Sequence, residues 1–275
     1  MSVTVIRPAG SAWLRVGEHL ARLRDYGDLL YTLSLHRISV RYKQTSLGLV
    51  WALLQPVMMM IIFTAVFSIL ARMPSDGTPY ALFAFAALLP WSFFNTAVTG
   101  GTNSLVTHTA LITKVYFPRE ILPITYVAAA LFDFAIGFVV LVALMFWFAV
   151  PLTPYALVLV PIVALLALWV LAVSLALAAI QVRFRDIGVA LPVLMQILMF
   201  ASPVIYPLSV VPASWRPWYL LNPLAGIVSA FRDVLLRQTL PEAYPLGMAC
   251  LTIAVTLPAA YVFFKHTEAT MADVI

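Results

Sequence analysis

The chain has 275 residues, of which 63% are hydrophobic and 10% charged, and its formal net charge is +5. Soluble domains are roughly 45–50% apolar, so this composition excludes an ordinary soluble domain and predicts an all-α, polytopic integral membrane protein. The basic excess is interpreted as a topological signal, because Lys and Arg collect on the cytoplasmic side of membrane proteins, and no nucleic-acid partner is expected.

Residues 1–36 are predicted to be an N-terminal amphipathic segment on the cytoplasmic side or at the membrane interface. Apolar side chains recur there at helical spacing, and charged ones occupy another face. The apolar positions are Trp13, Val16, Leu20 and Leu23, and the charged ones are Arg15, Glu18, Arg22 and Asp25. A soluble helix that packs on a partner protein remains the alternative. The segment carries too many charges for a cleaved signal sequence, so membrane insertion is expected to depend on the later helices.

The stretch VRYKQTSLGLVWALLQP, residues 40–56, joins a basic segment directly to an apolar run. The last charge before the membrane is Lys43 and the next is Arg72. The residues between them exceed the ~20 apolar residues that a membrane-spanning helix needs. The stretch therefore predicts a cytoplasmic anchor that leads into the first span.

Residues 37–275 are predicted to form one domain with six transmembrane helices. The expected spans are 47–70, 80–101, 123–149, 155–180, 188–206 and 244–264. Twelve Lys and Arg residues fall on the side of the two termini and four on the other side, so both termini are expected in the cytoplasm.

Two cytoplasmic loops resemble docking elements. The loop 102–122 mixes apolar and charged residues and is broken by Pro118, so one face of it is suited to a groove on a soluble partner. The loop QVRFRDI, residues 181–187, contains Arg183, Arg185 and Asp186. It is either a docking loop or a positive-inside loop in which Asp186 caps the fifth span.

Asp133 is the only ionisable residue within the six expected spans. An acid at membrane depth is expected to face a water path or to be hydrogen-bonded to a neighbouring helix. Because no basic residue accompanies it in the spans, a proton relay and an ion-coupled carrier are disfavoured. We expect a structural or channel-lining role.

The segment 207–243 is too apolar for an ordinary aqueous loop. It predicts two short helices near 209–220 and 224–238, broken at Asn222 and Pro223. Backbone of this kind at membrane depth must be buried in protein or line a cavity, so we expect re-entrant helices on the external side between spans five and six. A simple amphipathic cap on the bundle is the alternative.

Several kinds of site are not expected. No glycine is followed by lysine, so the chain has no phosphate-binding loop of the Walker type, and an active transporter of this sequence would take its energy from a separate subunit or from an ion gradient. The four histidines are not at metal-ligand spacing, and no catalytic constellation is visible, so we expect no metal, no cofactor in this chain and no enzymatic activity. Cys250 lies in an apolar run and is expected to be a small buried hydrophobe.

Aromatic residues are abundant within the spans and offer uncharged stacking surfaces for sugar rings. Most are expected to pack in the core or against lipid. Trp51, Trp91 and Phe94 are the candidates for a substrate path, together with Asp133.

Six ordered segments resemble one family of membrane proteins. They are VRYKQTSLGLVWALLQP (40–56), LLPWSFF (88–94), LITKVYFPREILP (111–123), VRFRDI (182–187), SPVIYPLSVVP (202–212) and NPLAGIVSAFRDVLL (222–236). Together they resemble the membrane subunit of bacterial ABC exporters for O-antigen, capsular polysaccharide and teichoic acid. The likeness begins near residue 37.

The resemblance implies a homodimer in the bacterial inner membrane, docked on a separate ATPase that holds ATP and Mg²⁺. It implies a lipid-linked glycan as substrate, O-antigen first, with teichoic acid or small lipophilic drugs as alternatives. By position, it implies ATPase coupling through Thr113, Lys114, Val115, Tyr116, Phe117, Arg119 and Glu120. It implies an external gate within 209–236 that includes Trp215, Trp218, Tyr219, Asn222, Phe231 and Arg232. Arg41, Tyr42 and Lys43 are the candidates for the place where the lipid diphosphate enters, and the topological reading of their charges stays open.

Overall fold

The computed structural model describes residues 24–43 and 50–274, and every regular element in these ranges is a helix. The predicted amphipathic face of Trp13, Val16, Leu20 and Leu23 lies outside the described residues. The long helices are α2 (Gly27–Lys43), α3 (Val50–Phe63), α4 (Tyr80–Thr107), α6 (Ile121–Trp147), α7 (Leu159–Arg183), α8 (Asp186–Phe200) and α11 (Ala243–Val274). The short ones are η2 (Thr64–Leu70), α5 (Thr109–Lys114), η3 (Pro154–Val158), η4 (Leu208–Val210), α9 (Arg216–Tyr219), α10 (Pro223–Arg232) and η5 (Asp233–Arg237).

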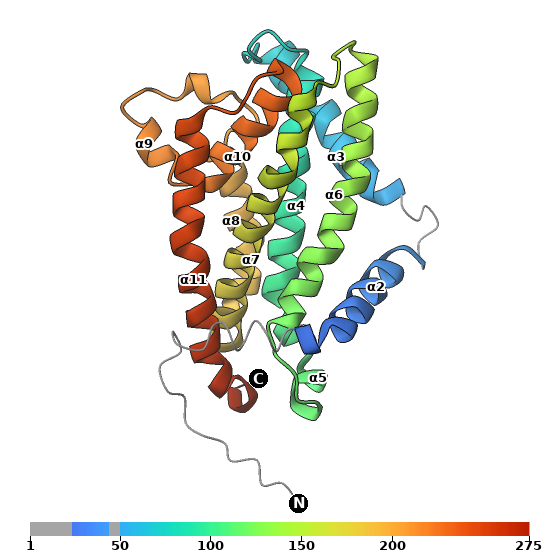
Figure 1. The fold of residues 1–275 in the computed structure, drawn as a ribbon, viewed down its shortest axis with the longest axis vertical. Helices are drawn as coiled ribbons and strands as arrows, with labels where there is room; N and C mark the ends of the chain where they lie inside the picture. The colour runs from blue at the N-terminus through green and yellow to red at the C-terminus, as the bar shows by residue number, and fades with distance from the viewer. Residues whose placement is uncertain (1–23, 44–49, 275) are drawn as a thin grey trace, which may run out of the picture.

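Five helical stretches of the described chain are long and apolar enough to cross a membrane. They are Leu53–Leu70, Tyr80–Thr107, Ile121–Trp147, Pro154–Arg183 and Ala243–Glu268. They correspond to the first four predicted spans and the last one, and they confirm the all-α class. They run side by side along the long axis of the molecule (Figure 1).

The predicted span 188–206 is shorter than expected. Its helix, α8, ends at Phe200 after 15 residues, which is about 22 Å, whereas a hydrocarbon core is about 30 Å thick. Pro203 explains the end, because proline has no N–H to donate and disfavours the helical conformation at Ser202 before it. The uncharged sequence continues past this point, so hydropathy alone could not locate the break.

Helix α4 is the centre of the bundle. In its most apolar stretch 78% of the residues are buried, against 17–33% in the other four spanning helices. Its neighbours approach closely at two glycines: a Cβ on Gly101 would lie 2.8 Å from Ser174 of α7, and one on Gly100 would lie 2.4 Å from the Tyr126 ring of α6. Side chains larger than hydrogen at these positions would push α6 and α7 away from α4.

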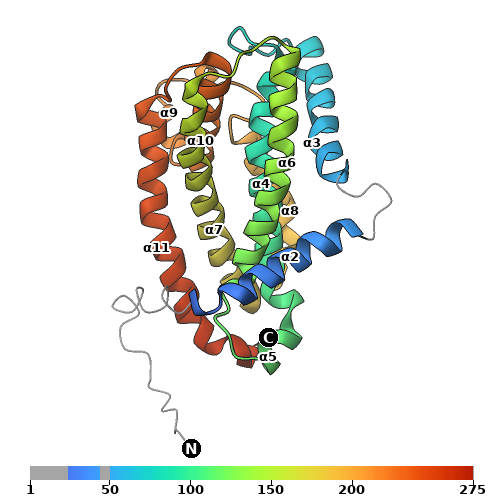
Figure 2. The same cartoon turned by 45° about the vertical axis from the view of Figure 1, so that its right-hand side comes forward.

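Helix α2 crosses the bundle obliquely near the end where α5 and the C-terminal part of α11 lie (Figures 1 and 2). A second, smaller hydrophobic cluster fills this end and includes Leu105, Phe117 and Phe264. Leu29, Leu30 and Leu33 of α2 pack on it. The cluster fixes the start of α2, α5 and the end of α11 against one another.

The surface of α11 corrects one prediction. Cys250 is exposed, not buried. Apolar neighbours do not distinguish a lipid-facing position from a core position, because a spanning helix is hydrophobic on both faces.

Candidate functional site

The end of α2 is joined to the middle of α6 by two polar side chains. Asp133 accepts a hydrogen bond from Arg41 Nη1 at one carboxylate oxygen and another from the Tyr42 hydroxyl at the other oxygen. Arg41 and Asp133 form an ion pair in which the side chains are 40% and 20% exposed. Burial and the hydrogen bond to Asp133 raise the pKa of Tyr42, so its hydroxyl remains a donor. The basic partner of Asp133 therefore comes from the helix before the first span, which a search within the spans could not find.

These residues close one side of a cavity of about 320 Å³, which we call the inner niche. It lies between the end of α2, the start of α3 and the middle of α4 and α6. Its wall is formed by Arg41, Tyr42, Trp51, Gln55, Pro56, Leu89, Ser92, Phe93, Thr96, Ala130, Asp133, Phe134 and Gly137.

The structure divides the predicted substrate-path residues into two groups. Arg41, Tyr42, Trp51 and Asp133 come together around the inner niche. Trp91 and Phe94 instead lie in the core of the bundle, with ring centroids 5.8 Å apart. The Lys43 side chain is exposed and does not line the niche.

Arg37, one turn before Arg41, makes a second connection between α2 and α6. Its Nε donates to Thr125 Oγ1 at 2.7 Å, and its guanidinium carbon lies 3.5 Å from the centre of the Tyr126 ring. Its Nη2 is 3.5 Å from Nε2 of His108, whose Nδ1 lies 2.8 Å from the Ser104 carbonyl oxygen. A carbonyl only accepts, so the proton sits on Nδ1 and Nε2 is left to accept from Arg37. Burial lowers the pKa of His108, and the nearby Arg37 lowers it further, which keeps the ring neutral.

His108 also lies at the junction between α4 and α5. It ends α4 and precedes the first residue of α5. The contact with Arg37 therefore links α2 both to α6 and to the start of the predicted coupling segment.

The predicted coupling residues point in different directions. Tyr116 is 88% exposed and Val115 is 52% exposed, and Thr113 and Lys114 are also exposed. Phe117 is 5% exposed and belongs to the hydrophobic cluster at this end. The segment thus exposes a tyrosine and a valine, while Phe117 packs on its own chain.

Glu120 and Arg119 belong to an internal polar group. Lys265 of α11 donates to the Glu120 carboxylate at 2.6 Å and to Glu268 Oε2 at 2.9 Å. Arg119 donates through its backbone N–H to Glu268 Oε1 at 3.0 Å and through Nη1 to the Glu268 carbonyl at 2.6 Å. This group forms one wall of a groove of about 1170 Å³, and the exposed residues of α5 and the following turn form another.

At the opposite end of the bundle, Arg232 of α10 is buried. Its guanidinium donates to the carbonyl oxygens of Pro203 at 2.6 Å and Val204 at 2.8 Å. It also lies 3.3 Å from the carbonyl oxygens of Phe83 and Tyr206, and its central carbon is 3.4 Å from the centre of the Phe83 ring. In the turn after α8 these backbone carbonyls have no helical N–H donors, and the Arg232 guanidinium donates to them instead.

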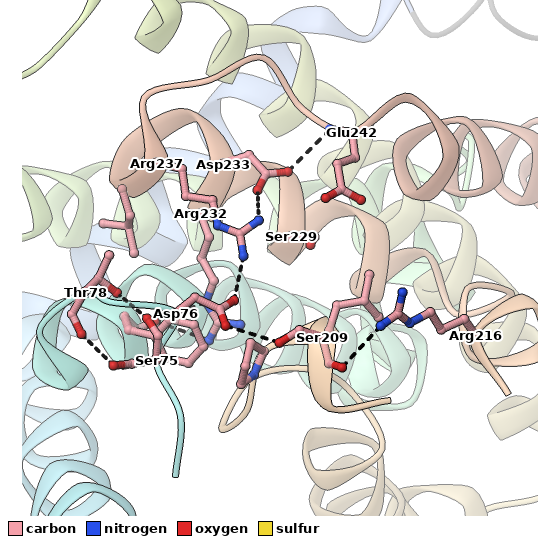
Figure 3. Close-up of a pocket in the computed structure, with 14 residues that line it drawn as sticks. Ser75, Asp76, Thr78, Ser209, Arg216, Ser229, Arg232, Asp233, Arg237 and Glu242 are labelled. Atoms are coloured by element: carbon pink, nitrogen blue, oxygen red, sulfur yellow. Dashed lines mark hydrogen bonds and ion pairs between the residues drawn. The ribbon is translucent and has the colours of Figure 1, made fainter. Parts of the chain in front are cut away.

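A network of ion pairs surrounds this position (Figure 3). Arg237 donates to Asp76 Oδ2 at 2.5 Å and to Asp233 Oδ1 at 3.0 Å. Ser209 donates to the other Asp76 oxygen at 3.2 Å, and Arg216 donates to the carbonyls of Ser209 and Val211. The loop after η2, the segment before α9 and the end of η5 are thereby held together.

The predicted helix break at Asn222 and Pro223 is confirmed. Asn222 Oδ1 accepts from the Leu224 N–H at 3.1 Å and caps α10, which begins at Pro223. The helix predicted for 209–220 is largely irregular and contains only the short η4 and α9.

The predicted gate residues again divide into two groups. Phe231 and Arg232 are buried, whereas Trp215 and Trp218 are 66% and 71% exposed. Tyr219 is partly exposed, and its hydroxyl lies 3.1 Å from that of Tyr206. Burial raises the pKa of Tyr219.

The loop between α7 and α8 exposes Arg183, Arg185 and Asp186. Asp186 is the first residue of α8, and its side chain makes no capping hydrogen bond. The predicted side-chain cap is therefore wrong, because the residue lies one position inside the helix. A carboxylate there still interacts favourably with the positive end of the helix dipole.

Sequence analysis missed Arg37, Asp76 and Arg237 as structural partners. The four-residue spacing of Arg37 and Arg41 places both on one face of a helix, and this signal could have identified the pair. Nothing in the local sequence links Asp76 to Arg237, which lie 161 residues apart. Within residues 24–43 and 50–274, no cluster of three His, Cys, Asp or Glu side chains has the arrangement of a metal site.

Comparison with known proteins finds a matching family model and several relatives of this chain. Residues 29–236 match the family model described as ABC-2 type transporter. The chain is 32% identical over 250 residues to the O-antigen export system permease protein RfbA of Myxococcus xanthus, an alignment that covers 90% of this chain and 95% of the relative. It is 23% identical over 239 residues to the protein of the same name from Klebsiella pneumoniae, with 86% and 92% covered. It is also 24% identical over 245 residues to the polysialic acid transport protein KpsM of Escherichia coli, with 87% and 93% covered.

Proposed function

The chain belongs to the ABC-2 type transporter family, and on that premise we propose that it is the membrane subunit of an ATP-driven exporter of polysaccharide. The substrate that we propose is a lipid-linked glycan, with O-antigen first. The observation that carries this proposal is the 32% identity to an O-antigen export permease over nearly the whole of both chains.

We propose that the chain crosses the bacterial inner membrane six times, with both termini in the cytoplasm. Helix α8 runs in the same direction as α6, and the irregular residues 201–206 extend it toward the end of the molecule where α9 lies (Figure 1). Counted together, α8 and this extension supply the crossing that is missing from the five long helices. In this arrangement α9 and α10 return into the external half of the protein as re-entrant elements, with α10 buried along most of its length.

The ATPase is a separate subunit that holds ATP and Mg²⁺, and it docks on the surface formed by Val115, Tyr116 and Lys114. These side chains project from the turn after α5, beside the groove of about 1170 Å³. Two copies of the chain form the complex with two ATPase subunits. The substrate reaches the pathway beside the inner niche and leaves past the segment stabilised by Arg232.

Deletion of the gene in the bacterium that encodes it tests the proposed function. We expect long-chain polysaccharide to disappear from the cell surface and lipid-linked glycan to accumulate in the inner membrane, as seen by gel electrophoresis and by lipid extraction. Expression of the intact chain should restore export. Normal surface polysaccharide in the deletion strain would contradict the proposal.

A capsule-type polysaccharide is the second candidate, because two relatives matched over 87% of this chain are polysialic acid transport proteins. Chemical analysis of the accumulated glycan distinguishes it from O-antigen and from teichoic acid. Export of small lipophilic drugs predicts instead that the deletion strain becomes drug-sensitive while its surface polysaccharide is unchanged.

A further inference from the structure

The inner niche has hydrogen-bond donors that its own walls do not use. Among the described residues, the indole N–H of Trp51, the amide of Gln55 and the hydroxyls of Ser92 and Thr96 make no hydrogen bond. Hydroxyls elsewhere in the spanning helices commonly donate to their own backbone, as Thr107 does to the Asn103 carbonyl at 2.8 Å. Several fully buried donors of the bundle also lack a partner, but those of the niche differ from them because they line a cavity.

The charged acceptor of the niche, the Asp133 carboxylate, is already occupied. Both carboxylate oxygens of Asp133 receive a donor, one from Arg41 and one from Tyr42. Arg41 commits Nη1 to this pair, which leaves other N–H groups of its guanidinium for a ligand. A ligand that carries negative charge and acceptor oxygens is thus complementary to the free N–H groups of Arg41 and to the unpartnered donors of the niche.

The remaining wall is apolar. Leu89, Phe93 and Phe134 belong to it, and the rings of Phe93 and Phe134 are 5.7 Å apart. Leu89 packs directly on Gly137, where a Cβ would lie 2.6 Å from Leu89 Cδ1. The niche thus combines polar donors with hydrocarbon surface, and this combination suits an amphiphile.

We propose that the inner niche binds the phosphate ester head of a lipid from the inner leaflet, with its acyl or prenyl chain against the apolar wall. Phosphate oxygens only accept, and arginine is the side chain best suited to them. The volume of about 320 Å³ lies at the lower end of ligand-binding pockets and suits a headgroup better than an oligosaccharide. The proposal rests on the proposed function in one respect, since the lipid-linked glycan is one lipid of this kind and an ordinary phospholipid is the other.

The test uses purified complex of the chain with its ATPase subunit, in detergent and without ATP. Two matched probe pairs differ only in phosphate: dioleoyl phosphatidate with dioleoylglycerol, and a long-chain polyprenyl phosphate with the corresponding polyprenol. Dissociation constants are measured by native mass spectrometry. We expect at least one phosphate probe to bind about tenfold more tightly than its phosphate-free partner, the size of effect expected for hydrogen bonds to a charged group.

Ser92→Ala with Thr96→Val removes two donors and keeps the side-chain volumes, and we expect this double variant to lose about tenfold in affinity for the phosphate probe. Thr107→Val is the matched control, because that hydroxyl lies on the same helix and is satisfied by its own backbone. If the double variant has a lower melting temperature than wild type, Trp51→Phe is used in its place, because it removes one donor at a half-exposed position.

Equal affinity of wild-type protein for probes with and without phosphate would overturn the proposal, as would unchanged affinity in both variants. Tight binding of polyprenyl phosphate alone identifies the export substrate as the occupant, and equal binding of phosphatidate identifies a resident phospholipid. Binding is measured without transport, so a chain that binds phosphate lipids but exports no polysaccharide would contradict the proposed function and leave this inference standing.

Discussion

At the scale of single residues, Arg232 is a buried cation that forms no ion pair within the described residues; four backbone carbonyls surround it instead. An unsatisfied buried carbonyl costs about 1–3 kcal/mol, so the arginine makes it possible for α8 to end inside the protein. A lysine would keep the positive charge, but its single ammonium group lacks the planar fork of N–H donors with which arginine reaches several separate carbonyls.

Arg232→Met should therefore destabilise the protein by roughly 3–5 kcal/mol, and Arg232→Lys by less. Thermal unfolding in detergent measures the difference, with Arg216→Met as the control, because Arg216 is more exposed and contacts only two carbonyls. A melting temperature of Arg232→Met equal to that of wild type would show that the turn after α8 is held by other contacts.

The Arg41–Asp133 ion pair fixes the end of α2. The pair is partly exposed, so we expect a coupling energy of about 1 kcal/mol. Arg41→Asp and Asp133→Arg should each reduce export, because each places two like charges together. The double exchange should restore part of it if the pair acts by holding α2. No recovery in the double variant, with normal membrane insertion, would show that one of the two residues has a separate role.

At the scale of elements, the turn after α5 offers a comparison between neighbouring residues. Tyr116→Asp changes an exposed side chain, whereas Phe117→Asp places a charge in the hydrophobic cluster. We expect Tyr116→Asp to leave thermal stability within about 0.5 kcal/mol and to weaken ATPase docking. Phe117→Asp should lower stability by several kcal/mol, because an unpaired charge is buried.

Co-purification with the ATPase and thermal melting separate these two effects. Thr107→Val again serves as a control at the same end of the bundle. Normal ATPase binding by a stable Tyr116→Asp protein would move the docking surface elsewhere, for example to the exposed loop of Arg183 and Arg185.

The sequence was sufficient to predict the long elements, for reasons that the structure makes clear. Spanning helices need about 20 uncharged residues, and this signal located four spans and the last one within a few residues. Asn222 and Pro223 predicted the start of α10, because the asparagine cap and proline act locally. The end of α8, the exposure of Cys250 and the partners of Asp133 depend on packing between distant segments, which a hydropathy pattern does not contain.

The residues of the candidate site also divide into those that the sequence could identify and those that it could not. Arg41, Tyr42, Trp51 and Asp133 could be named because charged and aromatic residues are conspicuous beside apolar runs. Gln55, Ser92 and Thr96 resemble ordinary polar residues in a spanning helix, and only the cavity distinguishes them. Trp91 and Phe94 were conspicuous for the same reason as Trp51, but they are core residues.

For the whole molecule, the direction of the spanning helices can be measured by cysteine labelling. Cys250 is the only cysteine in the chain and is exposed, so one substitution gives a background without cysteine. We expect Cys250→Ala to leave export unchanged, since it shortens a side chain on the surface of α11. In that background, a cysteine at Gly77 should react with a membrane-impermeant maleimide from outside intact cells, and one at Tyr116 should react only after the membrane is permeabilised.

Gly77 and Tyr116 lie in the loops at opposite ends of α4, so the two results together fix its direction. The reverse labelling pattern would invert the topology, and labelling of both sites in intact cells would contradict a single spanning helix.

The polar contacts of α2 also set an order of events during synthesis. Asp133 follows Arg41 in the chain by 92 residues, and Thr125 follows Arg37 by 88. At ribosomal rates of about 5–20 residues per second, α6 leaves the ribosome roughly 5–18 seconds after α2. During that interval α2 has neither of its arginine contacts on α6. The first helix of the described chain therefore cannot complete its arginine contacts until α6 has been synthesised.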